Sequence, residues 1–450
     1  MVKFSKLLGN NPPMAAVETL LSARWIIPVE PDGVVFENHA VVIRDGRILD
    51  ILPRKQARCA YPAAHEEHFP AHALLPGFIN AHTHAAMVLL RGIADDKPLM
   101  EWLTAHIWPL EQRWMGEAFV RDGSDLAMAE MIRGGITCFN DMYFFPEVTA
   151  RQAVRCGMRA MLGMILVDFP TAWASGPDEY IEKGLALHDE LRNDPLVTLA
   201  FAPHAPYTVS NEPLLRIGAL AAELDRPIHI HLHETRDEID QSRKQFGMTP
   251  IRRLQQLDLL GPSLMAVHMT QLSDEDIDLI ARNSVHVVHC PESNLKLASG
   301  FCPVAKLVAA GVNVAIGTDG AASNNDLDIM GEMRTAALLA KAVAADASAI
   351  PARTALRMAT LNGAKALGLD GETGSLERGK AADITAIRLD GLETQPLFDP
   401  ISDLVYAASR HQVSDVWVAG RRLLKARELT TLDLPDLIRK AATWRSKLTA

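Results

Sequence analysis

The sequence predicts an α/β protein, namely a (β/α)8 barrel of the TIM type with a small β-sandwich domain formed from both chain ends. Three observations support this fold class. Short apolar runs alternate with segments of helical periodicity, eight such runs can be counted, and β-rich segments flank them on both sides. Alternating strands and helices predict a parallel sheet, and eight such units are the number that closes into a barrel.

Each apolar run has the length and composition of a buried strand, and the segments between the runs are rich in helix formers. The expected strands are Leu74–His84, Ile136–Met142, Arg159–Asp168, Val197–Ala205, Pro227–Glu234, Leu264–Thr270, Ser284–Cys290 and Asn313–Asp319. The expected helices include Gly123–Arg133, Pro146–Cys156, Glu212–Leu224, Asp274–Ala281 and Pro303–Ala310.

Both ends of the chain have short strands and turns instead. Asp45-Gly46 lies between two apolar runs, which is a strong hairpin signal. Ala381–Leu389 and Asp415–Leu424 have similar composition near the other end. We therefore expect one β domain built from residues 1–70 and 375–450, the latter with a terminal helix, and a metal-dependent barrel of residues 71–374.

Composition excludes several classes of partner. The net charge is −10 with both signs interspersed and without a Lys/Arg block, which argues against nucleic acid or an anionic membrane as a partner. The five cysteines are scattered and never form CxxC, which fits a reducing compartment. Neither the first residues nor any later run is apolar enough for a signal peptide or a membrane span. We expect a cytoplasmic homo-oligomer that acts on a small molecule.

Histidines and carboxylates gather at the ends of the expected strands. His82 and His84 end the first strand two residues apart, so their side chains point the same way. Active sites of such barrels lie at the C-terminal ends of the strands. Four other strands end in similar residues, which are His204, the His229–Glu234 segment, His268 and Asp319. Three histidines and a carboxylate would suit a divalent metal such as zinc, with one position left for water.

Some of these histidines, and three nearby tryptophans, also have interpretations that do not involve a metal site. His229, His231 and His233 share one side of their strand, so not all of them can reach the barrel rim, and His229 is expected to be a hydrogen-bonded core residue. Trp102 and Trp108, with Trp114, follow the first strand in what we expect to be a long loop. They could equally belong to the core or form a lid over a ring-shaped substrate.

Five segments that contain these residues resemble the amidohydrolase superfamily. They are LPGFINAHTH from Leu75, HLHET from His231, HCPESNLK from His289, GTDGA from Gly317 and GSLERGKAAD from Gly374. The similarity is greatest to the branch of 5'-methylthioadenosine/S-adenosylhomocysteine deaminases. It implies hydrolytic deamination of an adenosine-type nucleoside, first of all 5'-methylthioadenosine to 5'-methylthioinosine and ammonia, and also of adenosine or S-adenosylhomocysteine.

The resemblance also implies a cofactor. It assigns one zinc ion, which iron or manganese could replace, to four ligands, namely His82, His84, His231 and Asp319. Superfamily members with two metals use a carboxylated lysine at the end of the fourth strand. This chain has Ala202-Pro203-His204 there, so a single metal is the better interpretation.

The remaining site residues follow from the same resemblance. Glu234, His268 and Asp319 would be catalytic and act on the attacking water molecule, and Glu234 and Asp319 would also contact the substrate. Glu111 corresponds to the glutamate that binds the ribose hydroxyls in this branch. His204 corresponds to the histidine that contacts the nucleoside.

The third strand departs from the branch pattern. Members that accept S-adenosylhomocysteine use an arginine in this region for the amino-acid carboxylate, whereas this chain has Met164 nearest that position and Arg159 five residues earlier. A methionine suits a methylthio group and would leave a buried carboxylate unpaired, which is costly. We therefore expect Met164 to contact the substrate, and methylthioadenosine or adenosine to be preferred over S-adenosylhomocysteine.

Two alternatives stay open. The same metal chemistry could act on another heteroaromatic ring, as in a guanine deaminase or a chlorotriazine hydrolase. Glu111 argues against this, because neither substrate has a ribose diol. A non-catalytic binding protein is the remote alternative, and such a protein would be expected to have lost at least one of the ligand residues, all of which are present.

Overall fold

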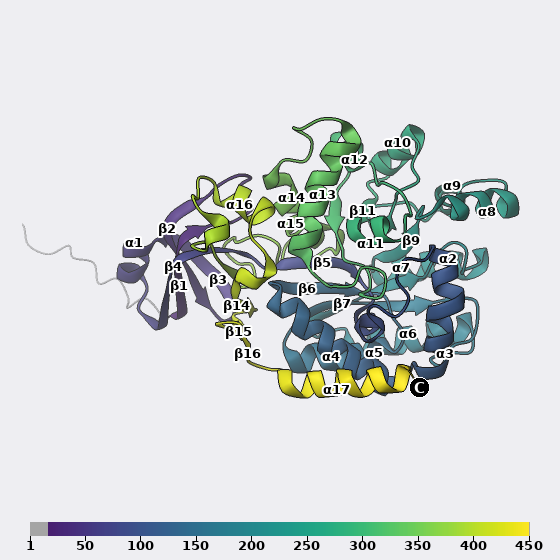
Figure 1. Ribbon diagram of the computed structural model, residues 1–450, viewed down its shortest axis with the longest axis horizontal. Helices are drawn as coiled ribbons and strands as arrows, with labels where there is room; N and C mark the ends of the chain where they lie inside the picture. Colours follow the sequence, from purple (N-terminus) through teal and green to yellow (C-terminus); the bar gives the residue numbers. More distant parts are fainter. Residues whose placement is uncertain (1–16, 450) are drawn as a thin grey trace, which may run out of the picture.

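The computed structural model describes residues 17–449 and contains two eight-stranded sheets (Figure 1). Residues 1–16, which include the segment expected to lack a signal peptide, and residue 450 lie outside this description. One sheet consists of parallel strands in sequence order, and the other joins strands from both ends of the chain. The predicted fold class, a barrel with a β domain from the two chain ends, is confirmed.

The barrel strands are hydrogen-bonded in parallel, each to the next along the chain. They are β5 (Phe78–Thr83), β6 (Ile136–Asp141), β7 (Arg159–Leu166), β8 (Val197–Pro203), β9 (Ile228–Leu232), β10 (Leu264–His268), β11 (His286–His289) and β12 (Val314–Ile316). The last strand comes close to the first just beyond its end, where the backbone N–H of Asp319 donates to the carbonyl of His82 at 3.0 Å. A Cβ on Gly317 would lie 2.7 Å from the His82 backbone nitrogen, so this approach requires glycine.

The first expected strand spans two elements. Its beginning belongs to β4 (Ala63–Pro76) of the other sheet, and only its later part forms β5. Gly77 separates the two strands, and a Cβ there would overlap the side chain of Thr137 at 2.1 Å. Both strands are buried at this junction, so hydrophobicity alone does not mark the boundary between them.

Helices surround the barrel (Figure 1), and most of them bury apolar side chains in the core that they share with the strands. They are α4 (Glu117–Arg133), α5 (Pro146–Cys156), α6 (Pro177–Leu191), α7 (Asn211–Leu224), α8 (Arg236–Phe246), α9 (Pro250–Gln256), α10 (Asp274–Arg282), α11 (Pro291–Lys296), α12 (Val304–Ala309), α13 (Ile329–Ala344), α14 (Ala352–Met358) and α15 (Leu361–Ala366). The signals at their ends are local: α5, for example, begins with a proline and ends before Gly157, which has φ 85°.

The β domain is a single run of hydrogen-bonded strands in the order β16-β15-β14-β13-β4-β1-β2-β3. Besides β4, its strands are β1 (Val17–Ile26), β2 (Phe36–Arg44), β3 (Arg47–Pro53), β13 (Ile384–Arg388), β14 (Val413–Val418), β15 (Arg421–Lys425) and β16 (Glu428–Leu429). The expected hairpin turn connects β2 and β3, with Asp45 and Gly46 both at positive φ. The helix α1 (Arg54–Ala60) packs on β2 and β3, whereas α16 (Pro400–Tyr406) packs on α13 and α14 of the barrel. Short helical turns lie at Leu392–Thr394 and Arg410–Gln412.

The segment between β5 and α4 is helical rather than a loop. It comprises η1 (Ala85–Leu90), α2 (Leu99–Glu101), η2 (Trp102–Ile107) and α3 (Trp108–Trp114). The C-terminal helix α17 (Leu434–Leu448) runs alongside α4 (Figure 1), and the Trp444 indole N–H donates to Asp122 at 3.0 Å. The Trp114 and Trp444 rings lie 6.3 Å apart, so α17 also supports the end of α3. No helix within residues 17–449 is both long and apolar enough to traverse a bilayer.

Candidate active site

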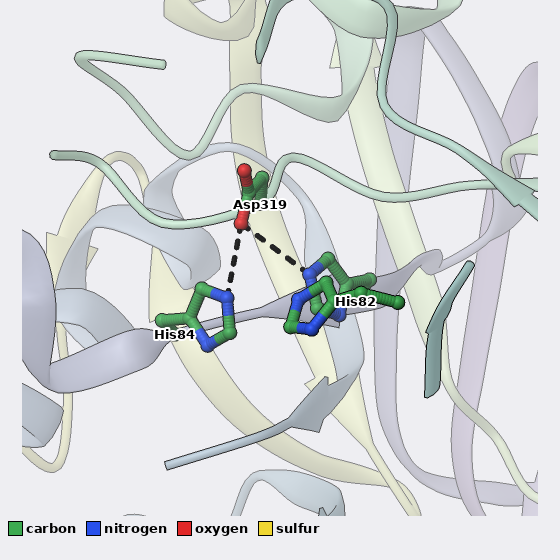
Figure 2. A group of neighbouring side chains, drawn as sticks. His82, His84 and Asp319 are labelled. Carbon is green, nitrogen blue, oxygen red and sulfur yellow. Dashed lines mark ion pairs between the residues drawn. The ribbon is translucent and has the colours of Figure 1, made fainter. Parts of the chain in front are cut away.

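Four of the sequence-predicted residues form a cluster at the C-terminal end of the barrel, and Figure 2 shows three of them, His82, His84 and Asp319. His82 lies near the end of β5 and His84 just after it, His231 lies in β9, and Asp319 follows β12. One candidate ligand atom from each residue lies within 4.8 Å of the other three. The Oδ1 atom of Asp319 is 3.3 Å from His82 Nε2 and 3.1 Å from His84 Nε2.

Each imidazole in the cluster is oriented through its other nitrogen. Nδ1 of His84 lies 2.5 Å from the Met142 carbonyl, and Nδ1 of His231 lies 2.7 Å from the His204 carbonyl. Nδ1 of His82 lies 2.9 Å from Nε2 of His229, so His229 is a hydrogen-bonded core residue as expected. These contacts leave all three Nε2 atoms available, and His82 Nε2 is buried without a hydrogen-bond partner. Three such nitrogens and one carboxylate oxygen fit a zinc ion.

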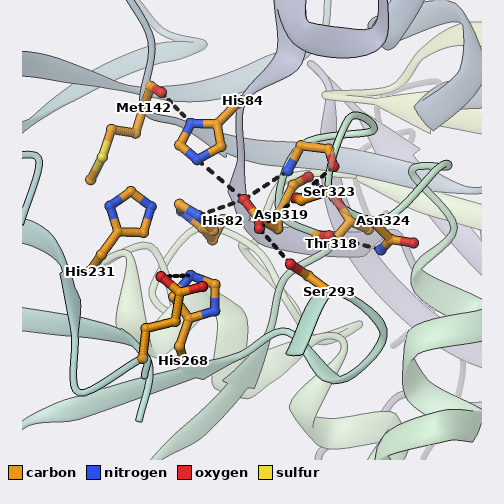
Figure 3. A network of polar contacts seen from close by, with 12 residues as sticks. His82, His84, Met142, His231, His268, Ser293, Thr318, Asp319, Ser323 and Asn324 are labelled. Atoms are coloured by element: carbon orange, nitrogen blue, oxygen red, sulfur yellow. Dashed lines mark hydrogen bonds and ion pairs between the residues drawn. The ribbon is translucent and has the colours of Figure 1, made fainter. Parts of the chain in front are cut away.

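Asp319 carries the negative charge of the cluster, and its two oxygens have different neighbours (Figure 3). Oδ2 accepts hydrogen bonds from the hydroxyls of Ser293 at 2.6 Å and Ser323 at 2.7 Å. Oδ1 faces the histidines and also accepts from the Gly320 backbone N–H at 2.8 Å. Burial opposes ionisation of Asp319, but His82 and His84 hold its pKa well below the usual range. Burial lowers the pKa of His82 to about 4, whereas the Asp319 carboxylate outweighs burial and raises the pKa of His84 to about 9.

Glu234 and His268 lie beside this cluster. Oε2 of Glu234 is 3.8 Å from Nε2 of His268, and the Ser299 hydroxyl is 3.4 Å from Oε1. Nδ1 of His268 lies 2.8 Å from the side-chain oxygen of Asn294, an atom that can only accept a hydrogen bond. Nδ1 therefore carries the proton and Nε2 faces Glu234. Burial raises the pKa of Glu234, so this carboxyl holds a proton more readily than an exposed glutamate.

A cavity of about 660 Å³ opens above the cluster, and the helical segment between β5 and α4 forms one of its walls. Trp102 and Trp108 line this cavity, whereas Trp114 does not. Further apolar lining comes from several elements, namely Leu99, Leu103, Ile107, Met115, Ile165, Val167, Phe169 and Leu297. The cavity therefore offers a largely apolar volume next to a strongly polar cluster, which suits an aromatic ring with reactive polar atoms.

Glu111 on α3 also lines this cavity. The hydroxyl of Tyr143 donates to its Oε1 atom at 2.6 Å. Burial raises the pKa of Glu111 to about 7, although the Tyr143 hydrogen bond opposes this rise. His204, which follows β8, completes the polar lining, with Nδ1 3.0 Å from the Thr208 hydroxyl. Burial, together with the neighbouring His84 and His82, lowers the pKa of His204 to about 3, so its ring is neutral.

The expected contact between Met164 and the substrate is wrong. Met164 is buried and does not line the cavity, because its side chain points out of the barrel toward Gly184 of α6. Ile165 and Val167, one and three positions later, line the cavity instead. Arg159 is also directed elsewhere, since its Nε donates to Asp383 at 2.8 Å in a buried ion pair at the β domain.

Sequence reasoning missed several supporting residues. Ser293 and Asn294 lie within the HCPESNLK segment, which could have indicated them, because that segment follows a strand at the barrel rim. Ser323 lies four residues after Asp319 and could have been inferred only from the geometry of that turn. Tyr143 has only its position just after β6 as a signal, and its partner Glu111 comes from a distant helix.

Known proteins resemble this chain over nearly its whole length. The amidohydrolase family matches residues 73–423. A protein of Teredinibacter turnerae named 5-methylthioadenosine/S-adenosylhomocysteine deaminase is 54% identical over 434 residues, which cover 96% of this chain and 98% of that protein. The structure of an adenosine deaminase from Xanthomonas campestris with bound zinc is 52% identical, covers 97% of this chain and 100% of that chain, and superposes with a TM-score of 0.96.

A more distant structure shares the fold alone. An atrazine chlorohydrolase from Arthrobacter aurescens complexed with zinc is 24% identical, with a TM-score of 0.89 and coverage of 95% of this chain and 99% of that chain. The family match spans the barrel together with β13 and β14 of the β domain, and the first relative exceeds half identity over almost all of both chains. The chain belongs to the amidohydrolase family.

Proposed function

We propose that this protein is a zinc-dependent hydrolytic deaminase of adenosine-type nucleosides, with 5'-methylthioadenosine as its preferred substrate. The single observation that carries this proposal is the position of Glu111. Its carboxylate is held by the Tyr143 hydroxyl and faces the same cavity as the metal-ligand cluster. A carboxylate can accept hydrogen bonds from both hydroxyls of a ribose diol. The relatives named as deaminases of nucleosides support the same conclusion.

The proposed chemistry replaces the amino group on C6 of the purine with oxygen from water and releases ammonia. A zinc ion held by His82, His84, His231 and Asp319 would lower the pKa of a water molecule toward neutrality and so supply the nucleophile. The orphaned His82 Nε2 atom and the nitrogen-rich ligand set fit such an ion.

The other groups in the cluster handle protons. We assign Glu234 to protonate the ring nitrogen beside C6 and then to carry a proton to the leaving ammonia. Its raised pKa supports this assignment, because a carboxyl must hold a proton near neutral pH to deliver it. His268 and Asp319 would orient the attacking water and accept its proton. Asn294 fixes the His268 ring with Nε2 toward Glu234, and neutral His204 would contact the nucleoside.

The cavity lining supports a preference for an uncharged 5' group. Among residues 17–449, none of those that line the cavity is a lysine or an arginine. The amino-acid carboxylate of S-adenosylhomocysteine would therefore lie in a largely apolar cavity without a cationic partner, which is costly. A methylthio group would instead contact the apolar side chains there. This argument takes the place of the sequence-based one, in which Met164 was to contact the methylthio group.

The test is release of ammonia from a panel of compounds by the purified, zinc-loaded protein. The panel contains methylthioadenosine, adenosine, S-adenosylhomocysteine, guanine and a chlorotriazine, the last with chloride release as an additional readout. We expect turnover of the nucleosides, with kcat/KM highest for methylthioadenosine. Turnover of guanine or the triazine alone would refute the nucleoside proposal. Equal or better use of S-adenosylhomocysteine would refute only the preference for an uncharged 5' group.

Assembly and cellular location stay predictions. We propose a cytoplasmic homo-oligomer, and the net charge of −10 argues against nucleic-acid partners. Sedimentation analysis of the purified protein tests the oligomer, and a nucleic-acid binding titration at low salt tests the expected lack of binding.

A further inference from the structure

The loop that carries Glu234 has an unfavourable backbone conformation. It connects β9 to α8, and His233, immediately before Glu234, has φ 53°. A left-handed conformation in a residue other than glycine is uncommon and is maintained only when the surrounding structure fixes it. The position of the proposed proton carrier therefore depends on whatever holds this loop.

Glu238, in the first turn of α8, holds the loop from one side. Its Oε1 atom accepts a hydrogen bond from the His233 backbone N–H at 3.0 Å, and its Oε2 atom accepts one from the Glu234 backbone N–H at 2.7 Å. On the other side, the Thr270 hydroxyl donates to the Glu234 carbonyl at 2.6 Å. The backbone of Glu234 is thus fixed through both its N–H and its carbonyl group.

Glu238 is buried, at 5% exposure, and it is not among the residues that line the substrate cavity. Burial raises its pKa, and the backbone N–H groups of Glu234 and His233 oppose this rise. A buried carboxylate is costly, and both of its oxygens are here committed to consecutive backbone N–H groups. An apolar side chain of similar volume would leave both backbone N–H groups unpaired, so the pairing fixes the conformation of this loop as well as stabilising the protein.

We propose that Glu238 is a positioning residue that sets the place of the Glu234 carboxyl group by binding the two backbone N–H groups of its loop. This inference rests on the proposed role of Glu234 in proton transfer. Small displacements of a catalytic group can cost about 100-fold in rate. Replacement of Glu238 would therefore lower the rate of the chemical step. It would not weaken nucleoside binding, which depends on residues that line other parts of the cavity.

The first test replaces Glu238 with glutamine. Glutamine keeps the length of the side chain but has only one acceptor atom, so its NH2 group would meet one of the two backbone N–H groups. We expect kcat for methylthioadenosine to fall by about 10–100-fold, with KM within about twofold and zinc content unchanged.

A matched control is Asp50→Asn. Asp50 in β3 is another carboxylate buried at 5% exposure, and its two oxygens accept from the Ile51 backbone N–H at 2.8 Å and from the Tyr61 hydroxyl at 3.1 Å, within the β domain. This variant should lose stability but keep kcat. An equal loss of kcat in both variants would overturn the inference, because it would indicate a general effect of altering a buried carboxylate.

The second test combines Glu238→Gln with Glu234→Gln. If Glu238 acts through the Glu234 carboxyl, the double variant should lose less than about twofold relative to Glu234→Gln alone. A further loss of 10-fold or more would overturn the inference. Should Glu238→Gln fail to fold, Thr270→Val removes the hydrogen bond on the other side of Glu234 and must show the same selective loss of kcat.

The two proposals fail in different ways. If Glu234→Gln keeps a near-normal rate, the proposed role of Glu234 is wrong and the inference about Glu238 falls with it. If Glu234→Gln loses turnover while Glu238→Gln keeps normal kcat, the inference is wrong and the proposed function stands.

Discussion

Removal of the Tyr143 hydroxyl tests the ribose site directly. Tyr143→Phe keeps the ring and deletes one hydrogen bond, the 2.6 Å contact with Oε1 of Glu111. A hydrogen bond to a charged group contributes about 1.5–3 kcal/mol, and about 1.4 kcal/mol corresponds to a tenfold change in affinity. Since Glu111 would still contact the ribose, we expect the lower end of that range, with KM for methylthioadenosine raised about tenfold and kcat within about twofold.

The pH dependence of KM gives a second readout. Burial raises the pKa of Glu111 to about 7 and the Tyr143 hydrogen bond lowers it, so the ribose meets a full carboxylate only above that pH. In the unaltered protein KM should therefore fall as the pH rises through about 7. In Tyr143→Phe the opposing hydrogen bond is absent, so the pKa of Glu111 rises further and the fall in KM should move to higher pH.

The assay is steady-state ammonia release at several pH values, with zinc content measured in each preparation. Tyr61→Phe is a matched control, because the Tyr61 hydroxyl donates to Asp50 at 3.1 Å within the β domain, far from the cavity. An unchanged KM for Tyr143→Phe over the whole pH range would refute the idea that Glu111 binds the ribose as an ionised carboxylate held by this tyrosine.

Four further predictions concern the cluster and the fold. Glu234→Gln should keep its zinc while turnover falls by about 10²–10⁴-fold, as loss of general acid–base catalysis implies; near-normal ammonia release would remove Glu234 from the mechanism. His231→Ala should weaken zinc affinity by more than about 10–100-fold, which is the loss expected when a residue that only hydrogen-bonds to a metal ligand is removed. Competition with a chromogenic chelator measures this affinity, and an undiminished affinity would exclude His231 as a ligand. Arg159→Met should lower the free energy of unfolding by about 3–5 kcal/mol in urea, because it leaves the carboxylate of Asp383 buried and unpaired; a loss below about 1 kcal/mol would contradict this. Met164→Leu should leave the preference among nucleosides unchanged in the ammonia assay, since Met164 lies outside the cavity, and a clear shift would return it to the site.

The barrel could be predicted because its signals are local. Each strand is a short apolar run, and the residues that face the active site follow at the strand ends, where polar side chains interrupt the apolar pattern. This pattern predicts His82, His268 and Asp319 as site residues, and they lie together in the structure. The wall between β5 and α4 is predicted as a long loop, because its helices are short and η2 is a π-helix, so the 3.6-residue periodicity of a long α-helix is absent from the sequence.

The direction of a side chain on a fully buried strand could not be predicted. Every residue of β7 is buried, so apolar side chains face both the barrel interior and the helices outside. Nothing in this pattern distinguishes Met164, which faces α6, from Ile165, which faces the cavity. The contact between Tyr143 and Glu111 joins two elements through tertiary packing, and no local pattern encodes such a pair.

The pairing of β4 with β13 has a consequence for synthesis of the chain. β4 is complete when residue 76 has been made, but β13, which forms antiparallel hydrogen bonds with it, begins only at Ile384. Until then one edge of the N-terminal strands is exposed while the barrel is being translated, and a free edge can pair with another chain. Glu66 and Glu67 in the outer half of β4 place charge on that strand, a feature that discourages such pairing. The strands from β13 onward, which complete the β domain, are thus synthesised last, although β1 to β4 of the same sheet are synthesised first. Truncated chains that lack these last strands should therefore aggregate.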